Sequence, residues 1–125
     1  MLLNVNGDAA AGEIAAALTA ERLIFLTDVE GIHDSSGKVM PRLNLAEARN
    51  MIASGTASEG MIPKIEASIK ALATVAIVHI IDGRILHTLL NVIASEAWQS
   101  QAKIPRLHSE QAPQSQFGGT IIVTE

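Results

Sequence analysis

The strongest constraint on the fold of this chain is the alternation of short apolar runs with segments of helical period. Apolar runs of strand length alternate with alanine-rich or i,i+4-patterned stretches along most of the sequence. Strands that alternate with helices favour a mostly parallel sheet covered by helices on both faces. The predicted strands are Leu2–Val5, Leu23–Leu26, Ala76–Ile81 and Ile121–Val123, with a β-hairpin over Ile32–Met40, and the predicted helices are Ala9–Ala20, 44–54, 60–72 and Ile85–Ala94.

Local signals sharpen several of these boundaries. Asn44 and Glu47 have the spacing of a capping box, and Gly55 follows as a helix stop. Pro63 fits the first turn of the next helix, because proline lacks the N–H that this position leaves unpaired. The four consecutive apolar residues of Leu23–Leu26 predict a strand that is buried on both faces.

One long segment does not fit a compact α/β domain. Ser95–Gln116 is polar, rich in Gln and Ser, and interrupted by Pro105 and Pro113. Connections of this length are uncommon in compact domains. We therefore expect a single domain over residues 1–125, with an insertion or mobile loop around 95–116.

Composition excludes several classes of function. With 125 residues, of which 48% are hydrophobic, the chain can bury a core. It has no cysteine, which excludes disulfides and metal sites with cysteine ligands. Neither its net charge of −4 nor its three aromatic residues suit a nucleic-acid surface. No apolar run reaches the length of a membrane span, and Met1–Asn6 lacks the basic start of a signal peptide. We expect a cytoplasmic protein that binds neither nucleic acid nor membrane.

The histidines suggest no metal site. His33, His87 and His108 lack the mutual spacing of metal ligands. His79 lies inside a predicted strand, so we interpret it as a buried residue whose hydrogen bonds are satisfied within the core.

Polar residues follow two of the apolar runs, where ligands bind in open α/β sheets. Asn4 and Asn6 lie on the same face of the first predicted strand, and Asp8 follows at the start of a helix. Asp28 follows the second run. Each carboxylate has a structural alternative, since Asp is a favoured N-cap and a common turn residue.

Lys64 is a candidate anion-binding residue. It stands in the first turn of a predicted helix, just after Gly60 and Met61, where the helix dipole disfavours a cation. A bound phosphate would reverse that preference, because free N–H groups and the ammonium would both attract it. The alternative is an exposed, solvated lysine.

Four motifs in order resemble the N-acetylglutamate kinase family of the amino acid kinase superfamily. They are Asn-Val-Asn-Gly-Asp-Ala-Ala-Ala at 4–11, Leu-Thr-Asp-Val-Glu-Gly at 26–31, Gly-Met-Ile-Pro-Lys-Ile-Glu-Ala at 60–67 and His-Ile-Ile-Asp-Gly-Arg at 79–84. The resemblance covers residues 2 to about 90, returns at 118–123, and matches the carboxy-terminal, nucleotide-binding half of the family.

The resemblance implies roles for particular residues. Asp8 and Lys64 would be catalytic, with Asp8 positioning the lysine and Lys64 contacting the phosphates. Asn4 and Asn6 would hold N-acetylglutamate. Thr27, Asp28, Val29, Gly31, Gly60, Met61 and Lys64 would bind ATP, with Mg²⁺ carried on the nucleotide phosphates and no metal held by the protein alone.

The same resemblance implies that part of the kinase is missing. The family's amino-terminal half carries a glycine-rich loop, a second catalytic lysine and the main dimer surface, so we expect a homo-oligomer or a partner that covers this half. Glu59 stands where the family usually has glycine. Three interpretations remain: an N-acetylglutamate kinase, a nucleotide-binding remnant or half-enzyme that needs a partner chain, and a kinase for another amino-acid carboxylate.

Overall fold

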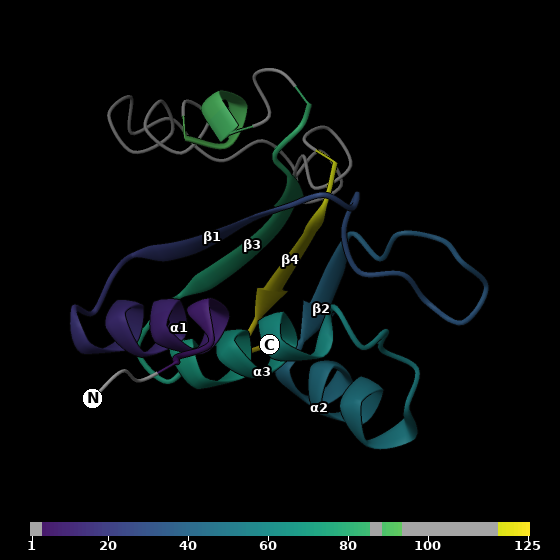
Figure 1. Cartoon of the computed structure of the whole chain (residues 1–125), viewed down its shortest axis with the longest axis horizontal. Coiled ribbons are helices and arrows are strands. Elements are labelled where there is room, and N and C mark those ends of the chain that lie inside the picture. The colour runs from purple at the N-terminus through teal and green to yellow at the C-terminus, as the bar shows by residue number, and fades with distance from the viewer. Residues whose placement is uncertain (1–3, 86–88, 94–117) are drawn as a thin grey trace.

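The fold is a four-stranded sheet with helices packed on it (Figure 1). The computed structural model describes residues 4–85, 89–93 and 118–125. The elements in chain order are α1 (Gly7–Ala17), β1 (Arg22–Thr27), β2 (Arg42–Asn44), α2 (Leu45–Ser54), α3 (Ile62–Ala71), β3 (Ile77–Asp82) and β4 (Thr120–Val123). Residues 89–93 are also helical.

The strand order is β1-β3-β4-β2. β1 runs parallel to β3, and β2 runs parallel to β4, whereas β3 and β4 are antiparallel. Two of the three pairings are therefore parallel, and the prediction of a mostly parallel α/β sheet is confirmed. β4 holds the two parallel pairs together, because it lies between β3 and β2.

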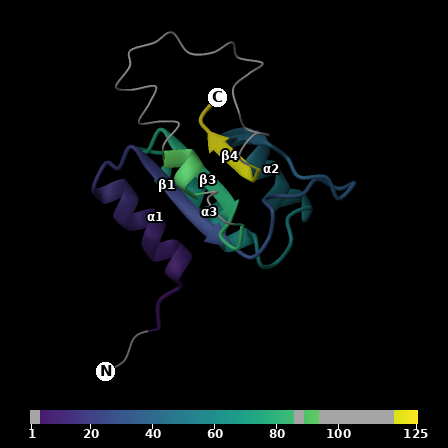
Figure 2. The same ribbon diagram turned by 90° about the horizontal axis from the view of Figure 1, so that it is seen from above.

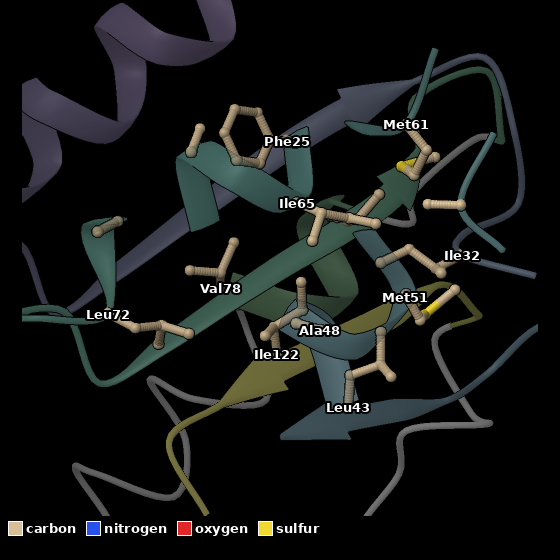
Figure 3. Close-up of a cluster of buried hydrophobic side chains, with 14 of the residues drawn as sticks. Phe25, Ile32, Leu43, Ala48, Met51, Met61, Ile65, Leu72, Val78 and Ile122 are labelled. Atoms are coloured by element: carbon tan, nitrogen blue, oxygen red, sulfur yellow. The ribbon is translucent and has the colours of Figure 1, made fainter. Parts of the chain in front are cut away.

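Helices cover both faces of the sheet, as predicted. Helices α1, α2 and α3 pack on one face, and the helical residues 89–93 lie across the sheet from them (Figures 1 and 2). The main core lies on the three-helix side and joins alternate residues of the strands to the inner faces of the helices (Figure 3). Its labelled members are Phe25, Ile32, Leu43, Ala48, Met51, Met61, Ile65, Leu72, Val78 and Ile122.

The local signals of the middle segment are confirmed. The Asn44 side chain accepts a hydrogen bond from the Glu47 amide, and the Glu47 carboxylate accepts one from the Asn44 amide. Gly55 then ends α2 in a left-handed conformation. Pro63 stands in the first turn of α3. The predicted hairpin over Ile32–Met40 is reduced to one antiparallel bridge between His33 and Val39, closed by a turn.

The predicted amino-terminal strand is wrong for the part that the structure describes. Asn4 and Asn6 are not in a strand. The Asn6 side chain instead accepts hydrogen bonds from the amides of Asp8 and Ala9 and caps α1, which starts at Gly7. Asn6 is therefore the N-cap and Asp8 lies inside the first turn, so the argument that placed Asn4 and Asn6 on one strand face no longer applies.

The burial predicted for the second strand is also wrong. In the described residues β1 pairs only with β3, so it is an edge strand, and its Leu26 remains 53% exposed. The face of β1 that carries Phe25 packs on the core, whereas the face that carries Leu26 is open. The short strand β2 went unpredicted because three residues show no periodicity.

Some predictions lie outside the described residues. These are the segment Ser95–Gln116, Leu2 and Leu3 of the first predicted strand, and parts of the predicted helix Ile85–Ala94. In the part of the chain that the structure describes, no helix is both long and apolar enough to cross a membrane.

Candidate functional site

The centre of the candidate site is an ion pair between the first turns of α1 and α3. Lys64 Nζ lies 3.2 Å from Asp8 Oδ2, and the two side chains are only 19% and 25% exposed. Lys64 is therefore partly buried and paired, not a fully exposed side chain. Since both helix N-termini carry partial positive charge, the Asp8 carboxylate offsets both the dipoles and the lysine.

Helices α1 and α3 are held in this register by contacts along their whole length. One turn below the ion pair, Gly12 packs so closely on α3 that an added Cβ would lie 2.7 Å from the carbonyl oxygen of Ala67. Further along, Glu13 pairs with Lys70, and Thr74 donates a hydrogen bond of 3.0 Å to the Ala16 carbonyl. The two helices therefore run side by side with their N-termini at the same end.

A cleft of about 230 Å³ opens beside Lys64. It is lined by three segments: the loop after β1, the turn between α2 and α3, and the start of α3. All seven residues that the sequence assigned to nucleotide binding line it, namely Thr27, Asp28, Val29, Gly31, Gly60, Met61 and Lys64. Residues from separate motifs thus converge on one cavity.

The cleft also has lining residues that the sequence reasoning missed. They are Ile32, His33, Asp34, Thr56, Ala57 and Ser58. Each lies within four residues of a quoted motif, so closeness in sequence was the available signal. Ile32 and Met61 also belong to the hydrophobic core (Figure 3). The lining of the cleft is therefore continuous with the packed interior.

Hydrogen bonds inside the turn that follows His33 fix the position of Asp34. Its Oδ1 accepts from the Ser36 hydroxyl at 2.6 Å and from the amides of Ser36 and Lys38. The Ser36 hydroxyl, followed by the Lys38 amide, lowers the pKa of the Asp34 carboxyl. Asp34 therefore remains an anion at the rim of the cleft.

A second carboxylate lies at the carboxyl end of β3, next to the end of β1. Asp82 is buried and accepts hydrogen bonds from Nε and Nη2 of Arg84, at 3.0 and 2.8 Å, and from the Arg84 amide. The Arg84 side chain lowers the pKa of Asp82 to about 2, and Asp82 in turn raises the pKa of Arg84, to which Asp28 adds a smaller effect. This pair therefore adds fixed charges beside the cleft.

The remaining predicted residues lie apart from the cleft lining. Asn4 and Asn6 are exposed before α1, and the amide oxygen of Asn6 is engaged in its cap. Glu59 is exposed between two lining residues without lining the cleft itself. His79 is buried with its Nε2 2.9 Å from Arg22 Nη1, which confirms its interpretation as a satisfied core residue.

The donor set of the cleft suits a phosphate better than a bare metal ion. Within residues 4–85, 89–93 and 118–125, no three His, Asp or Glu side chains are grouped so that they could hold a metal. The ammonium of Lys64 and the start of α3 present positive charge to the cavity, and Gly60 leaves open space where other residues have a Cβ. A metal brought by phosphates would meet Asp28 at the same cleft.

The sequence pattern of the amino acid kinase family matches residues 2–82. The chain belongs to the amino acid kinase family. Its curated relatives include the acetylglutamate kinases of Dehalococcoides mccartyi (strain 195), 51% identical over 89 residues, and Synechococcus elongatus (strain PCC 7942), 50% identical over 98 residues. These matches cover 71% and 75% of this chain but 33% of each relative. This amino acid kinase chain thus spans about a third of the length of the relatives it matches.

Solved structures agree with the family. The N-acetylglutamate synthase of Neisseria gonorrhoeae, complexed with coenzyme A and L-arginine, matches 98% of this chain and 24% of its own, with a TM-score of 0.71 at 26% identity. Carbamate kinase from Giardia lamblia bound to AMP-PNP matches 97% of this chain and 36% of its own, with a TM-score of 0.68 at 18% identity. The second likeness shows the fold alone.

Proposed function

We propose that this chain is the nucleotide-binding part of an N-acetylglutamate kinase. The observation that carries the proposal is the convergence of all seven predicted nucleotide residues on one cleft, beside the Asp8–Lys64 pair. The 50% identity to acetylglutamate kinases supports the choice of acceptor. The activity would belong to arginine biosynthesis in the cytoplasm.

The proposed reaction transfers a phosphoryl group from Mg-ATP to the γ-carboxylate of N-acetylglutamate. A carboxylate oxygen forms a bond to the γ-phosphorus, the bond from that phosphorus to the bridging oxygen breaks, and ADP leaves with the electron pair. Such transfers need positioning and charge neutralisation more than covalent catalysis. The products are an acyl phosphate and ADP.

Each residue of the site has a part in this proposal. Lys64 neutralises charge on the transferring phosphoryl group, and Asp8 holds the ammonium in place at 3.2 Å. The loop from Thr27 to Gly31 and the turn at Gly60 and Met61 enclose the nucleotide, with Mg²⁺ reaching the site on the phosphates. Asn4 contacts N-acetylglutamate, and the amide nitrogen of Asn6 donates to it while its oxygen caps α1.

A complete active site requires more protein than these 125 residues. The curated relatives are about three times longer than the matched segment. We therefore propose that a second polypeptide segment, or another copy in a homo-oligomer, covers the acceptor side. For the same reason a nucleotide-binding half-enzyme without turnover is the second candidate function. The third interpretation is a kinase that phosphorylates another amino-acid carboxylate. Turnover measured with different acceptors distinguishes it from an N-acetylglutamate kinase.

The test is calorimetric titration of the 125-residue chain with Mg-ATP. We expect saturable binding that Lys64→Ala weakens by about tenfold, the loss expected for a charge-assisted phosphate contact. Lys70→Ala is the matched control, because Lys70 lies on the same helix with its side chain 65% exposed and away from the cleft lining. Equal affinity of the Lys64 variant and the wild type would refute the role of Lys64, and no binding at all would refute the proposed function.

A further inference from the structure

The loop that lines the cleft is anchored by a hydroxyl from the far end of the chain. We call residues 27–34 the cleft loop. Thr120, the first residue of β4, is only 1% exposed. Its Oγ1 accepts a hydrogen bond of 2.9 Å from the Ile32 amide and donates one of 2.6 Å to the Met40 carbonyl. One hydroxyl therefore satisfies a backbone donor and a backbone acceptor on both sides of the His33–Val39 bridge.

The surroundings leave this hydroxyl little freedom. An added Cβ on Gly31 would lie 2.7 Å from Thr120 Oγ1. An added Cβ on Gly119 would lie 2.5 Å from the Ile80 carbonyl oxygen, so β4 enters the sheet in close contact with β3. The Thr120 hydroxyl is thus fixed by the central sheet on one side and touches the cleft loop on the other.

The residue that Thr120 binds, Ile32, is itself part of the cleft lining. Ile32 is fully buried in the core and lines the cleft, and its neighbours Gly31 and His33 line it too. Without the hydroxyl, the buried Ile32 amide would lose the hydrogen bond that Thr120 accepts from it. An unpaired buried amide is costly enough to displace the loop. No change at Lys64 or Asp8 is needed for the cavity to alter its shape.

We propose that Thr120 is a positioning residue for nucleotide binding, which acts by holding the Ile32 amide so that the cleft loop keeps its shape. The inference rests on the proposed function, because the nucleotide is the ligand whose affinity reports the loop. Thr120 does not line the cleft, and its effect on the ligand passes through the backbone of residues 31–33.

The experiment compares two substitutions of nearly the same size. Thr120→Val keeps the shape and removes the hydroxyl, whereas Thr120→Ser keeps the hydroxyl. Mg-ATP affinity is measured by calorimetry, and exchange of the Ile32 amide with deuterium is followed by NMR in the absence of nucleotide. Thr74→Val is the matched control, since it also removes a hydroxyl-to-carbonyl hydrogen bond. Thr74 follows the carboxyl end of α3, whereas the cleft lies at the start of this helix.

We expect Thr120→Val to weaken Mg-ATP binding by about tenfold and to expose the Ile32 amide to exchange, with Thr120→Ser and Thr74→Val close to the wild type. Unchanged affinity in the valine variant, or an equal loss in the serine variant, would overturn the inference. If the valine variant does not fold, amide exchange in the wild type tests the inference instead. An Ile32 amide that exchanges much faster than the amides of β3 would also overturn the inference. Absence of Mg-ATP binding in the wild type refutes the proposed function, while the exchange rates still test the role of Thr120.

Discussion

The contact between Gly12 and α3 allows a quantitative test of how the two helices are held together. Replacing Gly12 with alanine adds one methyl group, which would lie 2.7 Å from the Ala67 carbonyl oxygen and 3.1 Å from the Ala67 Cβ. Carbon atoms pack best at about 3.5–4.0 Å, so the helices must separate by roughly 0.5–1 Å. The obstacle is backbone, which cannot rotate away as a long side chain can.

The magnitude follows from two opposing terms. Overpacking of this kind costs roughly 1–3 kcal/mol, and the exchange of glycine for alanine inside a helix returns roughly 0.5–1 kcal/mol. We therefore expect Gly12→Ala to lower the free energy of unfolding by up to about 2.5 kcal/mol. The widened gap also lengthens the Asp8–Lys64 pair, which lies one turn above this contact.

Gly7→Ala provides the matched comparison. Gly7 begins the same helix, and an added Cβ there meets nothing within 4 Å. The variant gains helix propensity without a clash, so the difference between the two variants approximates the packing cost, about 1–3 kcal/mol. Urea unfolding followed by circular dichroism at equal m-values measures this difference. Gly12→Ala and Gly7→Ala of equal stability would refute the reasoning that the close approach of α1 to α3 depends on glycine.

Two further predictions concern charge. Because Arg84 holds the pKa of Asp82 at about 2, below its ordinary 3.8, the pair stabilises the fold fully above pH 3.8, and this stability is lost as the pH falls toward about 2. Urea midpoints over this range should fall more steeply for the wild type than for Arg84→Met, and parallel curves would contradict the linkage. Glu59→Gly should tighten Mg-ATP binding about two- to fivefold, because an exposed carboxylate next to Gly60 repels phosphate. Calorimetry that finds no gain would reject this repulsion.

Sequence reasoning succeeded where the physical cause is local. The capping box of Asn44 and Glu47, the Gly55 stop and Pro63 all act within one helical turn, so their signals are complete in a few residues. The apolar run of β3 was also found, because a central strand carries apolar residues on both faces. Competition between neighbours was harder to judge: Asn6 and Asp8 are both good caps, and only the backbone shows that Asn6 takes this position.

Sequence reasoning failed where the cause lies far along the chain. The apolar run of β1 could not reveal that one of its sides has no pairing strand among the described residues. Seven of the residues that line the cleft were named through the family resemblance. Thr120 was not, since it lies 88 positions from its partner Ile32. Hydrogen bonds of this kind leave no periodicity and no spacing for a reader of the sequence to recognise.

The central place of β4 has a consequence for how the chain acquires its structure. A ribosome makes this strand after the other three, yet β2 joins the described sheet only through it. Helix α1, β1, α3 and β3 can assemble while synthesis continues, but β2 must wait unpaired until residue 123 has emerged. A nascent chain that stalls before residue 118 would hold an incomplete sheet, with the open edges of β3 and β2 available to chaperones or to aggregation.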